Sequence, residues 1–285
     1  MNSQIEQIIR QTLAGLSAHQ VETSAYEIKL LLAEVLGCNA GSVLSYPRGL
    51  TERQLRQFEE FVALRRRHVP ADKIIGHRGF YKYEFAVNSD VLSPRPDTEI
   101  LVEAAIRGAL AENSRTVLEL GVGSGCVILS VLADCPQLSG TGVDISDAAL
   151  AVARRNAETM GLAQRLDLRR SDWFAADFAA QFASGFDMVV SNPPYIARKE
   201  ILSLDAEVRD YDPRAALDGG EDGLDSYRRI AALAPQLLNE GGRIYLEVGE
   251  GQAREVSALF AANGLTPEKI LKDLGGVERC VILKK

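Results

Sequence analysis

Apolar residues recur at helical spacing along the first part of the chain. They form one stretch at Ile5, Ile8, Ile9, Leu13 and Leu16 and a second at Ile28, Leu31, Leu32, Val35 and Leu36. Ser24 and Glu27 have the spacing of a capping box before the second stretch, and Gly37 is a typical helix stop after it. A third amphipathic stretch begins near Thr51. The pattern predicts a helical domain over residues 1–73, too small to bury much apolar surface alone.

A different pattern covers residues 74–92. Two glycines precede a group of aromatic and β-branched residues that lies between Phe80 and Val87. This composition predicts a β-hairpin that links two domains. We expect a further amphipathic helix from about Ile100, with Asp97 or Thr98 as its N-cap.

From Thr116 onward, short runs typical of buried strands alternate with amphipathic helices. The expected strands cover residues 116–120, 141–145, 166–171, 186–190, 243–248, 268–271 and 279–283. The expected helices cover residues 126–133, 148–160, 226–238 and 252–263. Such alternation is typical of a mainly parallel sheet with helices on both faces, so we predict an α/β domain over residues 93–285.

Composition mainly excludes classes of function. The formal net charge of −7 argues against a protein that depends on generic attraction to phosphate. The basic run at residues 65–68 is expected to be a solvated helix end. Four cysteines without CxxC spacing indicate a reducing compartment, and three histidines without a ligand pattern indicate no metal site. Because there is neither a membrane-length apolar run nor a secretory signal pattern, we expect a cytoplasmic protein without a membrane span.

A glycine-rich turn follows the strand at 116–120 and precedes a helix. The turn consists of Gly121, Val122, Gly123, Ser124 and Gly125. Asp144 ends the next strand about 20 residues later, where an acid accepts hydrogen bonds from ribose hydroxyls. Glycines let a ligand approach the backbone, and the helix start points at it. The context therefore predicts a nucleoside-containing cofactor on this turn.

The spacing within the turn favours S-adenosylmethionine over a nicotinamide dinucleotide. Cys126 stands where the dinucleotide fingerprint has its third glycine. Glu119, just before the turn, favours the ammonium end of S-adenosylmethionine. Trp173 follows the third strand, where an adenine would lie, so we expect it to contact the cofactor rather than only to pack in the core.

Asn192, Pro193, Pro194 and Tyr195 follow the fourth strand. Neither proline can donate to a strand ladder, so the chain leaves the sheet here. The result is a stiff turn with fixed carbonyl acceptors, which suits a flat group that carries an NH2. The segment 196–224 after it is long for a connection, and we expect it to act as a lid.

Several motifs together resemble the bacterial release factor glutamine methyltransferases. They lie at residues 94–99, 119–125, 192–195, 218–224, 246–249 and 273–279, and with the helical N-terminal part they span nearly the whole chain. The Asn-Pro-Pro-Tyr turn marks a wider class of amino methyltransferases, which includes enzymes that act on DNA adenine and RNA guanine. The Pro-Arg-Pro-Asp-Thr-Glu segment and the helical part narrow the resemblance to the glutamine branch. Members often have Asp where Glu119 stands.

The resemblance implies a Rossmann-like methyltransferase domain with a seven-stranded sheet, beside a small N-terminal helical bundle that recognises the substrate. The implied reaction transfers a methyl group from S-adenosyl-L-methionine to N5 of the glutamine in the Gly-Gly-Gln motif of class I peptide chain release factors. The second product is S-adenosyl-L-homocysteine. The resemblance further implies a monomer that needs no metal and makes no direct contact with nucleic acid.

The resemblance also assigns roles to residues. The implied catalytic residues are Asn192, Pro193 and Tyr195, and Pro194 joins them in the substrate site. The Asn192 side-chain oxygen and the Pro193 carbonyl would accept the two N–H bonds of the glutamine amide and stabilise the charge that develops on its nitrogen. Tyr195 would stack on the glutamine or form a wall beside it. The implied cofactor site consists of Gly121, Val122, Gly123, Ser124, Gly125, Asp144, Trp173 and Asn192.

Three alternatives stay open at this stage. An amino methyltransferase for adenine N6 or guanine N2 shares the Asn-Pro-Pro-Tyr turn but would show a basic face or an added recognition domain. A non-catalytic binding module would keep the nucleotide fold without transferring a group. A nicotinamide-dependent oxidoreductase is disfavoured by the glycine spacing.

Overall fold

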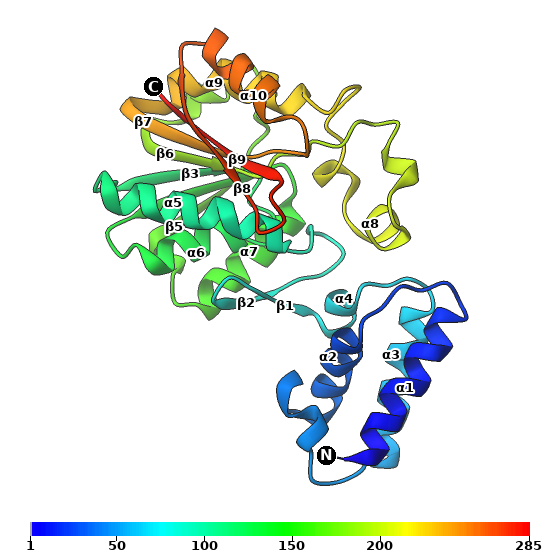
Figure 1. Cartoon of the computed structure of the whole chain (residues 1–285). Helices are drawn as coiled ribbons and strands as arrows, with labels where there is room; N and C mark the ends of the chain where they lie inside the picture. The colour runs from blue at the N-terminus through cyan, green and yellow to red at the C-terminus, as the bar shows by residue number, and fades with distance from the viewer. Residues whose placement is uncertain (1) are drawn as a thin grey trace. The chain divides into compact units, whose positions relative to one another are not determined.

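The structure is a computed structural model that describes residues 2–285, and the chain folds into two compact units (Figure 1). The helical unit holds the residues up to His77 together with Asp205–Tyr211. The sheet unit holds Arg78–Leu204 and Asp212–Lys285. The sequence pattern did not indicate that Asp205–Tyr211 returns to the helical unit.

The helical unit is built from amphipathic helices around one apolar core. Its elements are α1 (Ser3–Ser17), α2 (Ala25–Leu36), the 3-10 helix η1 (Ala40–Ser45), α3 (Glu52–Arg65), α4 (Ala71–Ile75) and α8 (Ala206–Tyr211). Ile5, Ile28 and Phe58 are buried in this core. The predicted capping box of Ser24 is confirmed, and Gly37 ends α2 in the left-handed region with φ 63°. The apolar periodicity thus predicted α1, α2 and α3 correctly.

The basic run at residues 65–68 follows the expectation of a solvated helix end only in part, because Arg66 and Arg67 are exposed after the end of α3 but Arg65 is buried. The Arg65 side chain is 0% exposed. Its guanidinium donates to the carbonyl oxygens of Val69 at 2.6 Å and Glu22 at 3.1 Å. It also donates to Glu207 Oε1 at 2.6 Å. A buried cation needs such partners, and Arg65 therefore joins α3 to α8 within the helical unit.

The sheet unit contains the predicted seven-stranded sheet. The strand order is β5-β4-β3-β6-β7-β9-β8. The strands are β3 (Thr116–Leu120), β4 (Ser139–Asp144), β5 (Leu166–Arg170), β6 (Phe186–Ser191), β7 (Leu238–Glu247), β8 (Thr266–Lys272) and β9 (Glu278–Lys284). Strands β3 to β7 pair in parallel with one another, and β9 runs antiparallel to both β7 and β8.

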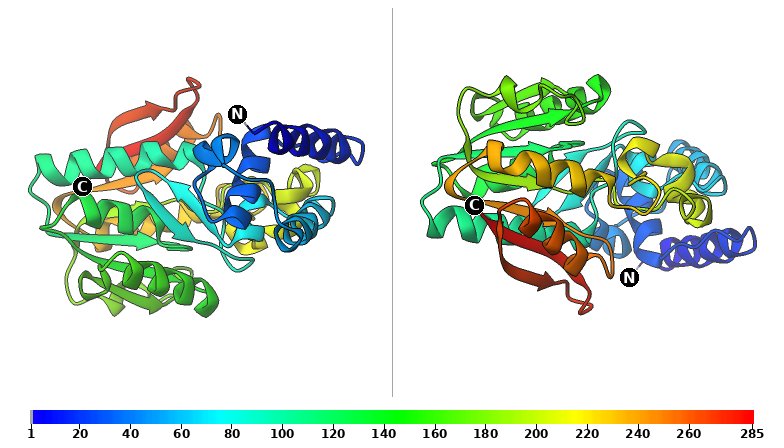
Figure 2. Two further views of the ribbon diagram at one scale, coloured as in Figure 1. Left: turned by 90° about the horizontal axis from the view of Figure 1, so that it is seen from below. Right: turned by 90° about the horizontal axis from the view of Figure 1, so that it is seen from above.

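Helices cover both faces of this sheet, as the two views of Figure 2 show. One face packs on α5 (Glu99–Ala111), α6 (Cys126–Asp134) and α7 (Asp147–Thr159), and the other on α9 (Asp225–Leu237) and α10 (Ala253–Ala262). Val117 and Leu118, neighbours on β3, belong to the two opposite cores, because successive strand residues point to opposite faces. Among residues 2–285, no helix combines the length and apolar character that a membrane crossing requires.

The aromatic segment after α4 forms the predicted hairpin. Its strands are β1 (His77–Phe80) and β2 (Tyr83–Ala86). Phe80 and Phe85 pack edge to face, with ring centroids 6.1 Å apart, and both lie in the core of the sheet unit. The hairpin therefore contributes to that core as well as connecting the chain.

Candidate active site

The strand register aligns four chemically important residues at the carboxyl edge of the sheet. Leu120 of β3 pairs with Val143 of β4 and with Ser191 of β6, and Ser191 pairs with Leu246 of β7. The residues that come directly after these paired positions in the sequence are Gly121, Asp144, Asn192 and Glu247. Ligands of open parallel sheets bind at this edge, where the carboxyl ends of the strands open into loops.

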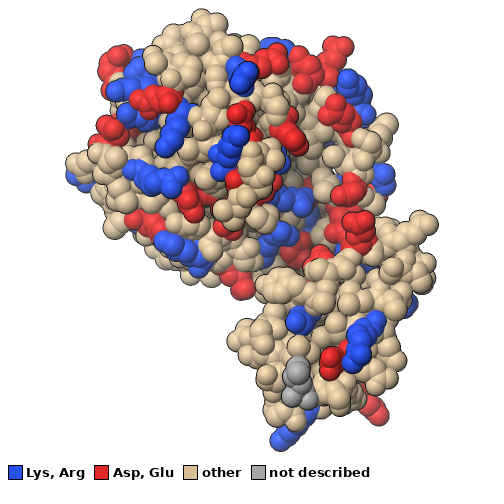
Figure 3. Space-filling model, in the orientation of Figure 1, with Lys and Arg blue, Asp and Glu red and all other residues tan. Residues whose placement is uncertain are grey.

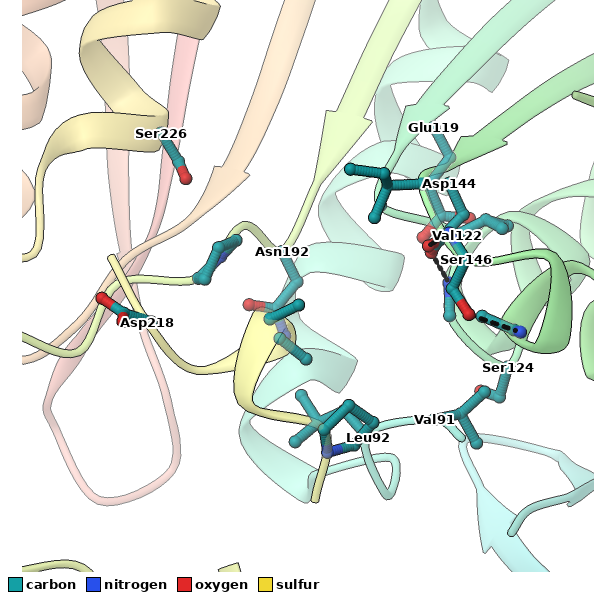
Figure 4. Close-up of a pocket in the computed structure, with 18 of the residues that line it drawn as sticks. Val91, Leu92, Glu119, Val122, Ser124, Asp144, Ser146, Asn192, Asp218 and Ser226 are labelled. Atoms are coloured by element: carbon teal, nitrogen blue, oxygen red, sulfur yellow. Dashed lines mark hydrogen bonds between the residues drawn. The ribbon is translucent and has the colours of Figure 1, made fainter. Parts of the chain in front are cut away.

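A cavity of about 500 Å³ lies at this edge. In Figure 4, Asn192 lies on one side of the cavity, and Glu119, Asp144 and Ser146 gather on the other. Most of the predicted cofactor residues line it, namely Gly121, Val122, Gly123, Ser124, Asp144, Trp173 and Asn192. The structure therefore brings the glycine turn and the Asn-Pro-Pro-Tyr turn to one space, although about 70 residues separate them in the sequence.

The glycine turn has a backbone that other residues rarely adopt. Gly121 has φ 77°, and a Cβ there would lie 3.2 Å from the Trp173 ring. Gly125 has φ 80° and caps the start of α6. Because Gly121 has no side chain, the Trp173 ring packs directly on the turn, and the turn's backbone stays open to a ligand.

Asp144 braces the turn while keeping acceptor capacity. Its Oδ2 accepts the N–H of Gly123 at 3.0 Å, and its Oδ1 accepts the N–H of Ser146 at 2.9 Å. Each carboxylate oxygen has a second lone-pair site. Asp144 can therefore hold the turn in place and still accept hydrogen bonds from two ribose hydroxyls.

Glu119 is a buried acid that lines the cavity. It is 2% exposed, and its Oε2 accepts the N–H of Ile128 at 3.1 Å. Burial raises the pKa of the Glu119 carboxyl well above its ordinary value, and the nearby charge of Asp144 raises it further. A cationic group in the cavity would offset both effects, so Glu119 suits an ammonium group.

One polar atom at the cavity lacks a partner among the described residues. It is Trp173 Nε1, a donor that is buried without a hydrogen bond. Buried polar groups are normally paired, so this atom indicates a ligand or ordered water. Together with the glycine backbone, the Asp144 oxygens and the Glu119 carboxyl, it fits a nucleoside that carries an amino acid, as S-adenosylmethionine does.

The Asn-Pro-Pro-Tyr turn presents only part of itself to the cavity. Asn192 and Pro194 line the cavity, and Asn192 Nδ2 donates to Thr98 Oγ1 at 3.2 Å. Pro193 is buried and is not among the lining residues. Tyr195 is not among them either, because its ring packs on a core of the sheet unit and its hydroxyl lies 3.5 Å from Glu247 Oε1. Its expected contact with a glutamine thus stays a prediction.

Thr98 does not have the capping role that the sequence suggested. It precedes α5 with a helical backbone, and its side chain makes no cap hydrogen bond. The 3-10 turn η2 (Pro96–Thr98) leads into the helix instead. The Thr98 hydroxyl is therefore available to Asn192, a partner that lies 94 positions away in the sequence.

Two contacts that the sequence did not indicate hold the segment after the turn. Arg95 donates to Asp212 Oδ2 at 2.7 Å, and the Asp212 side chain is 1% exposed. Ile196 donates its N–H to the Leu217 carbonyl at 3.0 Å and accepts the N–H of Gly219 at 2.9 Å. Arg95 and Asp212 both lie on loops and far apart in the sequence, so their pairing can be recognised only in the three-dimensional structure.

No group of three or more His, Cys, Asp or Glu side chains in residues 2–285 is arranged to hold a metal ion. The four cysteines are free thiols.

Comparisons with known proteins agree with this geometry. Residues 96–207 match the family described as "Methyltransferase small domain", and residues 7–76 match "PrmC N-terminal domain". The chain is 44% identical to the release factor glutamine methyltransferase of Rhodospirillum rubrum, over 93% of this chain and 80% of that protein. It is 43% identical to the protein of the same name from Cereibacter sphaeroides, over 96% of this chain and 95% of that protein.

A solved methyltransferase from Pyrococcus furiosus shares the fold. Its TM-score is 0.50 at 17% identity, and the match covers 83% of this chain and 99% of that one. At this identity the likeness concerns the fold alone. The family assignment rests on the release factor glutamine methyltransferases of Rhodospirillum rubrum and Cereibacter sphaeroides.

Proposed function

The chain belongs to the family of release factor glutamine methyltransferases, and from that premise we propose that it methylates a glutamine side-chain amide in peptide chain release factors. The proposed acceptor is N5 of the glutamine in the Gly-Gly-Gln motif. The observation that carries the proposal is the position of Asn192, an amide at the end of β6 that lines the same cavity as Asp144 and the glycine turn.

The chain is an S-adenosylmethionine-dependent methyltransferase. When bound, this cofactor supplies an electrophilic methyl group on a sulfonium and leaves as S-adenosyl-L-homocysteine. We assign its ribose to Asp144, its ammonium group to Glu119, and its adenine to the side of the cavity where Trp173 lies.

A carboxamide nitrogen is a poor nucleophile, because its lone pair is shared with its carbonyl. The protein can make this nitrogen more reactive by fixing the orientation of the carboxamide. If Asn192 Oδ1 and the Pro193 carbonyl accept the two N–H bonds, the nitrogen lone pair is directed into the cavity, and positive charge that develops there is stabilised. Holding the two reactants in this geometry makes the step effectively unimolecular. Once the methyl is attached, the nitrogen carries a positive charge and two protons, and one of them is acidic enough to be lost to water, so no strong base is required.

Mass spectrometry tests the proposed function most directly. We expect a release factor incubated with this protein and S-adenosylmethionine to gain one methyl group on the Gly-Gly-Gln glutamine. A release factor with Gly-Gly-Asn in place of Gly-Gly-Gln serves as the control and should gain none. An unmodified glutamine, or a methyl group on another residue, would contradict the proposal.

Replacing Asn192 tests its role in transfer. In Asn192→Ala we expect transfer to fall by about 100-fold or more, because one oriented acceptor in an active site is typically worth that much. Calorimetry should find the affinity for S-adenosyl-L-homocysteine within a few-fold of wild type, since Asp144 and the glycine turn are unchanged. Wild-type turnover in this variant would remove Asn192 from the mechanism.

The nucleic-acid alternative is not favoured. The net charge is −7, and basic and acidic side chains are interspersed on the face of the molecule drawn in Figure 3. A protein that binds nucleic acid usually gathers Lys and Arg on one face. Labelled methyl from the cofactor should reach release factor and neither DNA nor RNA.

We further propose that the helical unit recognises the body of the release factor, and that the protein acts as a monomer in the cytoplasm. Residues 7–76 of this unit are similar to a domain that accompanies the methyltransferase domain in the family. The expected result is a kcat/KM at least tenfold higher for an intact release factor than for a Gly-Gly-Gln peptide. Equal kcat/KM values for the two substrates would show that the protein recognises the Gly-Gly-Gln motif alone.

A further inference from the structure

Two buried groups beside Asn192 have no function in the mechanism so far. Thr98 is 2% exposed and makes no cap bond at the start of its helix. Glu247 is 2% exposed, and within residues 2–285 its carboxyl has few hydrogen-bond partners, namely the hydroxyls of Thr98 and Tyr195. A buried carboxyl group that is so sparsely paired is costly, so its presence at the active edge of the sheet calls for an explanation.

Glu247 lies beside the Asn-Pro-Pro-Tyr turn because of the strand register. Leu246 of β7 pairs with Ser191 of β6, so Glu247 and Asn192 are the next residues of neighbouring parallel strands. Tyr195 Oη lies 3.5 Å from Glu247 Oε1, and Tyr227 Oη donates to the Glu247 carbonyl at 2.9 Å. Burial raises the pKa of the Glu247 carboxyl, and a hydrogen bond from the Thr98 side chain opposes that shift.

The hydroxyl of Thr98 connects the two sides of this arrangement. A hydroxyl has one proton to donate and two acceptor sites. Its oxygen accepts from Asn192 Nδ2 at 3.2 Å, so its own proton must go to another acceptor. The ionised Glu247 carboxylate is a pure acceptor and provides that place. With the proton committed there, only the NH2 end of the Asn192 amide can face Thr98.

We infer that Thr98 and Glu247 are positioning residues that fix the direction of the Asn192 side-chain amide. The direction of donation runs from Asn192 Nδ2 to Thr98 Oγ1 and from Thr98 to the Glu247 carboxylate. Asn192 Oδ1 is thereby left toward the cavity as an acceptor for the substrate. This inference rests on the proposed function, since it explains how Asn192 is kept ready to accept the N–H of a glutamine amide.

Reversal of this direction would present the wrong end of Asn192. If the Glu247 carboxyl is protonated, it can itself donate to Thr98 Oγ1. The Thr98 proton is then free to turn to Asn192, and an amide that has rotated to accept it offers its NH2 to the substrate. Two N–H groups facing one another cannot form a hydrogen bond, so transfer would fail in that state.

The surroundings of Glu247 determine the pH at which its carboxyl becomes protonated and the hydrogen bonds reverse. Burial raises the pKa of Glu247 to about 7, with Thr98 and Arg279 opposing the shift and Asp97 adding to it. The titratable and charged groups that face it are Asp97 from η2, Tyr195 from the turn, Tyr227 from α9, Arg279 and Cys280 from β9, and Cys126 from α6. Of these, Asp97 and Arg279 are an ion pair at 3.4 Å. Glu247 is thus the group expected to change charge near neutral pH.

The experiment compares Thr98→Val, Thr98→Ser and Glu247→Gln with wild type on a Gly-Gly-Gln peptide. Thr98→Val keeps the shape of the side chain and removes the hydroxyl, and we expect kcat to fall about tenfold or more. Thr98→Ser restores the hydroxyl and should recover most of that loss. The affinity for S-adenosyl-L-homocysteine and the melting temperature should change little in both, which separates positioning from a structural role.

The pH profile gives a second, independent measurement. Wild-type kcat should fall about tenfold for each pH unit below 7, as Glu247 becomes protonated. This acid limb should be absent in Glu247→Gln, which has no titrating group at this position. An unchanged acid limb in Glu247→Gln, wild-type turnover in Thr98→Val, or a Thr98→Ser variant as slow as Thr98→Val would each overturn the inference.

A spectroscopic readout tests the inference even if the proposed function fails. With asparagine side chains labelled with 15N, the Asn192 amide protons should show one ordered pair of signals in wild type with S-adenosyl-L-homocysteine bound. In Thr98→Val the pair should shift and broaden, because the amide can rotate. An ordered, unshifted pair in Thr98→Val would contradict the inference, whereas absence of methyl transfer by wild type would contradict only the proposed function.

Discussion

At the scale of single residues, two glycines allow the segment 196–224 to pack directly on the Asn-Pro-Pro-Tyr backbone. A Cβ at Gly219 would lie 2.8 Å from Tyr195 Cα, and a Cβ at Gly223 would lie 2.4 Å from the Tyr195 carbonyl oxygen. Real Cβ atoms do not approach backbone this closely, so a side chain at either position would force the turn to move. The sequence motif at 218–224 marked these glycines as part of the family resemblance, but it did not say what they touch.

Gly223 allows this contact to be tested against a matched control. Gly223 has φ 82° and Gly251 has φ 81°, but a Cβ at Gly251 would have nothing within 4 Å. Gly251→Ala should therefore lose only the backbone strain of about 1 kcal/mol. Gly223→Ala adds a clash with Tyr195, and we expect it to cost about 2 kcal/mol more in the free energy of unfolding.

Chemical denaturation measures the two costs, and turnover shows whether the clash reaches the site. Methyl transfer should fall in Gly223→Ala and stay near wild type in Gly251→Ala, both measured well below their melting temperatures. Equal stability and equal activity of the two variants would mean that the turn is not held by this packing.

The sequence predicted which residues belong to the site better than it predicted which side chains contact one another there. The glycine turn, Asp144 and Asn192 were recognisable because each follows a strand, and parallel strands deliver their carboxyl ends to one edge. The partner of Thr98 was not recognisable. A threonine before a helix has a common local use as a cap, whereas its actual partner, Asn192, is brought near only by the tertiary fold.

At the scale of elements, the short helix α8 is tied to the helical unit by polar contacts. Arg65 of α3 donates to Glu207 of α8 at 2.6 Å, and Tyr211 Oη donates to the Arg67 carbonyl at 2.6 Å. Lys73 also donates to the Tyr211 carbonyl. A six-residue helix with no buried residue of its own depends on such contacts for its place.

The pair Arg65 and Glu207 makes this dependence measurable. Glu207→Gln removes the charge opposite a guanidinium that is 0% exposed, and we expect a loss of about 3 kcal/mol in the free energy of unfolding, since an unpaired buried cation is strongly unfavourable. The double variant Arg65→Met, Glu207→Leu removes both charges and should recover much of that loss. Denaturation of Arg65→Met, Glu207→Leu and their double variant gives the coupling energy. Additive effects would show that the pair does not act as a unit.

Helices and strands were predicted correctly from the sequence where their pattern of apolar residues extends over many positions. Helices such as α1 and α3 repeat their apolar positions over several turns, and strands such as β3 and β6 are continuous apolar runs, so each was predicted near its observed bounds. Helix α8 spans only six residues, Ala206–Tyr211, and too few periods exist there for a pattern to be read. Its grouping with the helical unit depends on Arg65, which composition alone suggested was at the surface.

At the scale of the whole molecule, the chain passes between the two units at three places. It crosses after His77, after Leu204 and again after Tyr211. The last two crossings flank α8 and lie inside the segment 196–224, which we expect to act as a lid. Asp212, next along the chain, belongs to the sheet unit and is bound there by Arg95. If a release factor binds the helical unit as proposed, it binds a unit to which the segment after the Asn-Pro-Pro-Tyr turn is covalently joined on both sides of α8.

Hydrogen exchange tests whether this connection is used. With S-adenosyl-L-homocysteine present throughout, we expect amides in residues 196–224 to exchange more slowly once a release factor is added, because the segment orders around the substrate. Helix α10 (Ala253–Ala262) should show no change and serves as the control. If a Gly-Gly-Gln peptide protects the segment as fully as an intact release factor, the ordering comes from the glutamine site alone. If only the intact factor protects it, contact with the helical unit is required, and Glu207→Gln, which loosens α8 from that unit, should weaken the protection. Equal exchange with and without the factor would mean that this segment is not a lid.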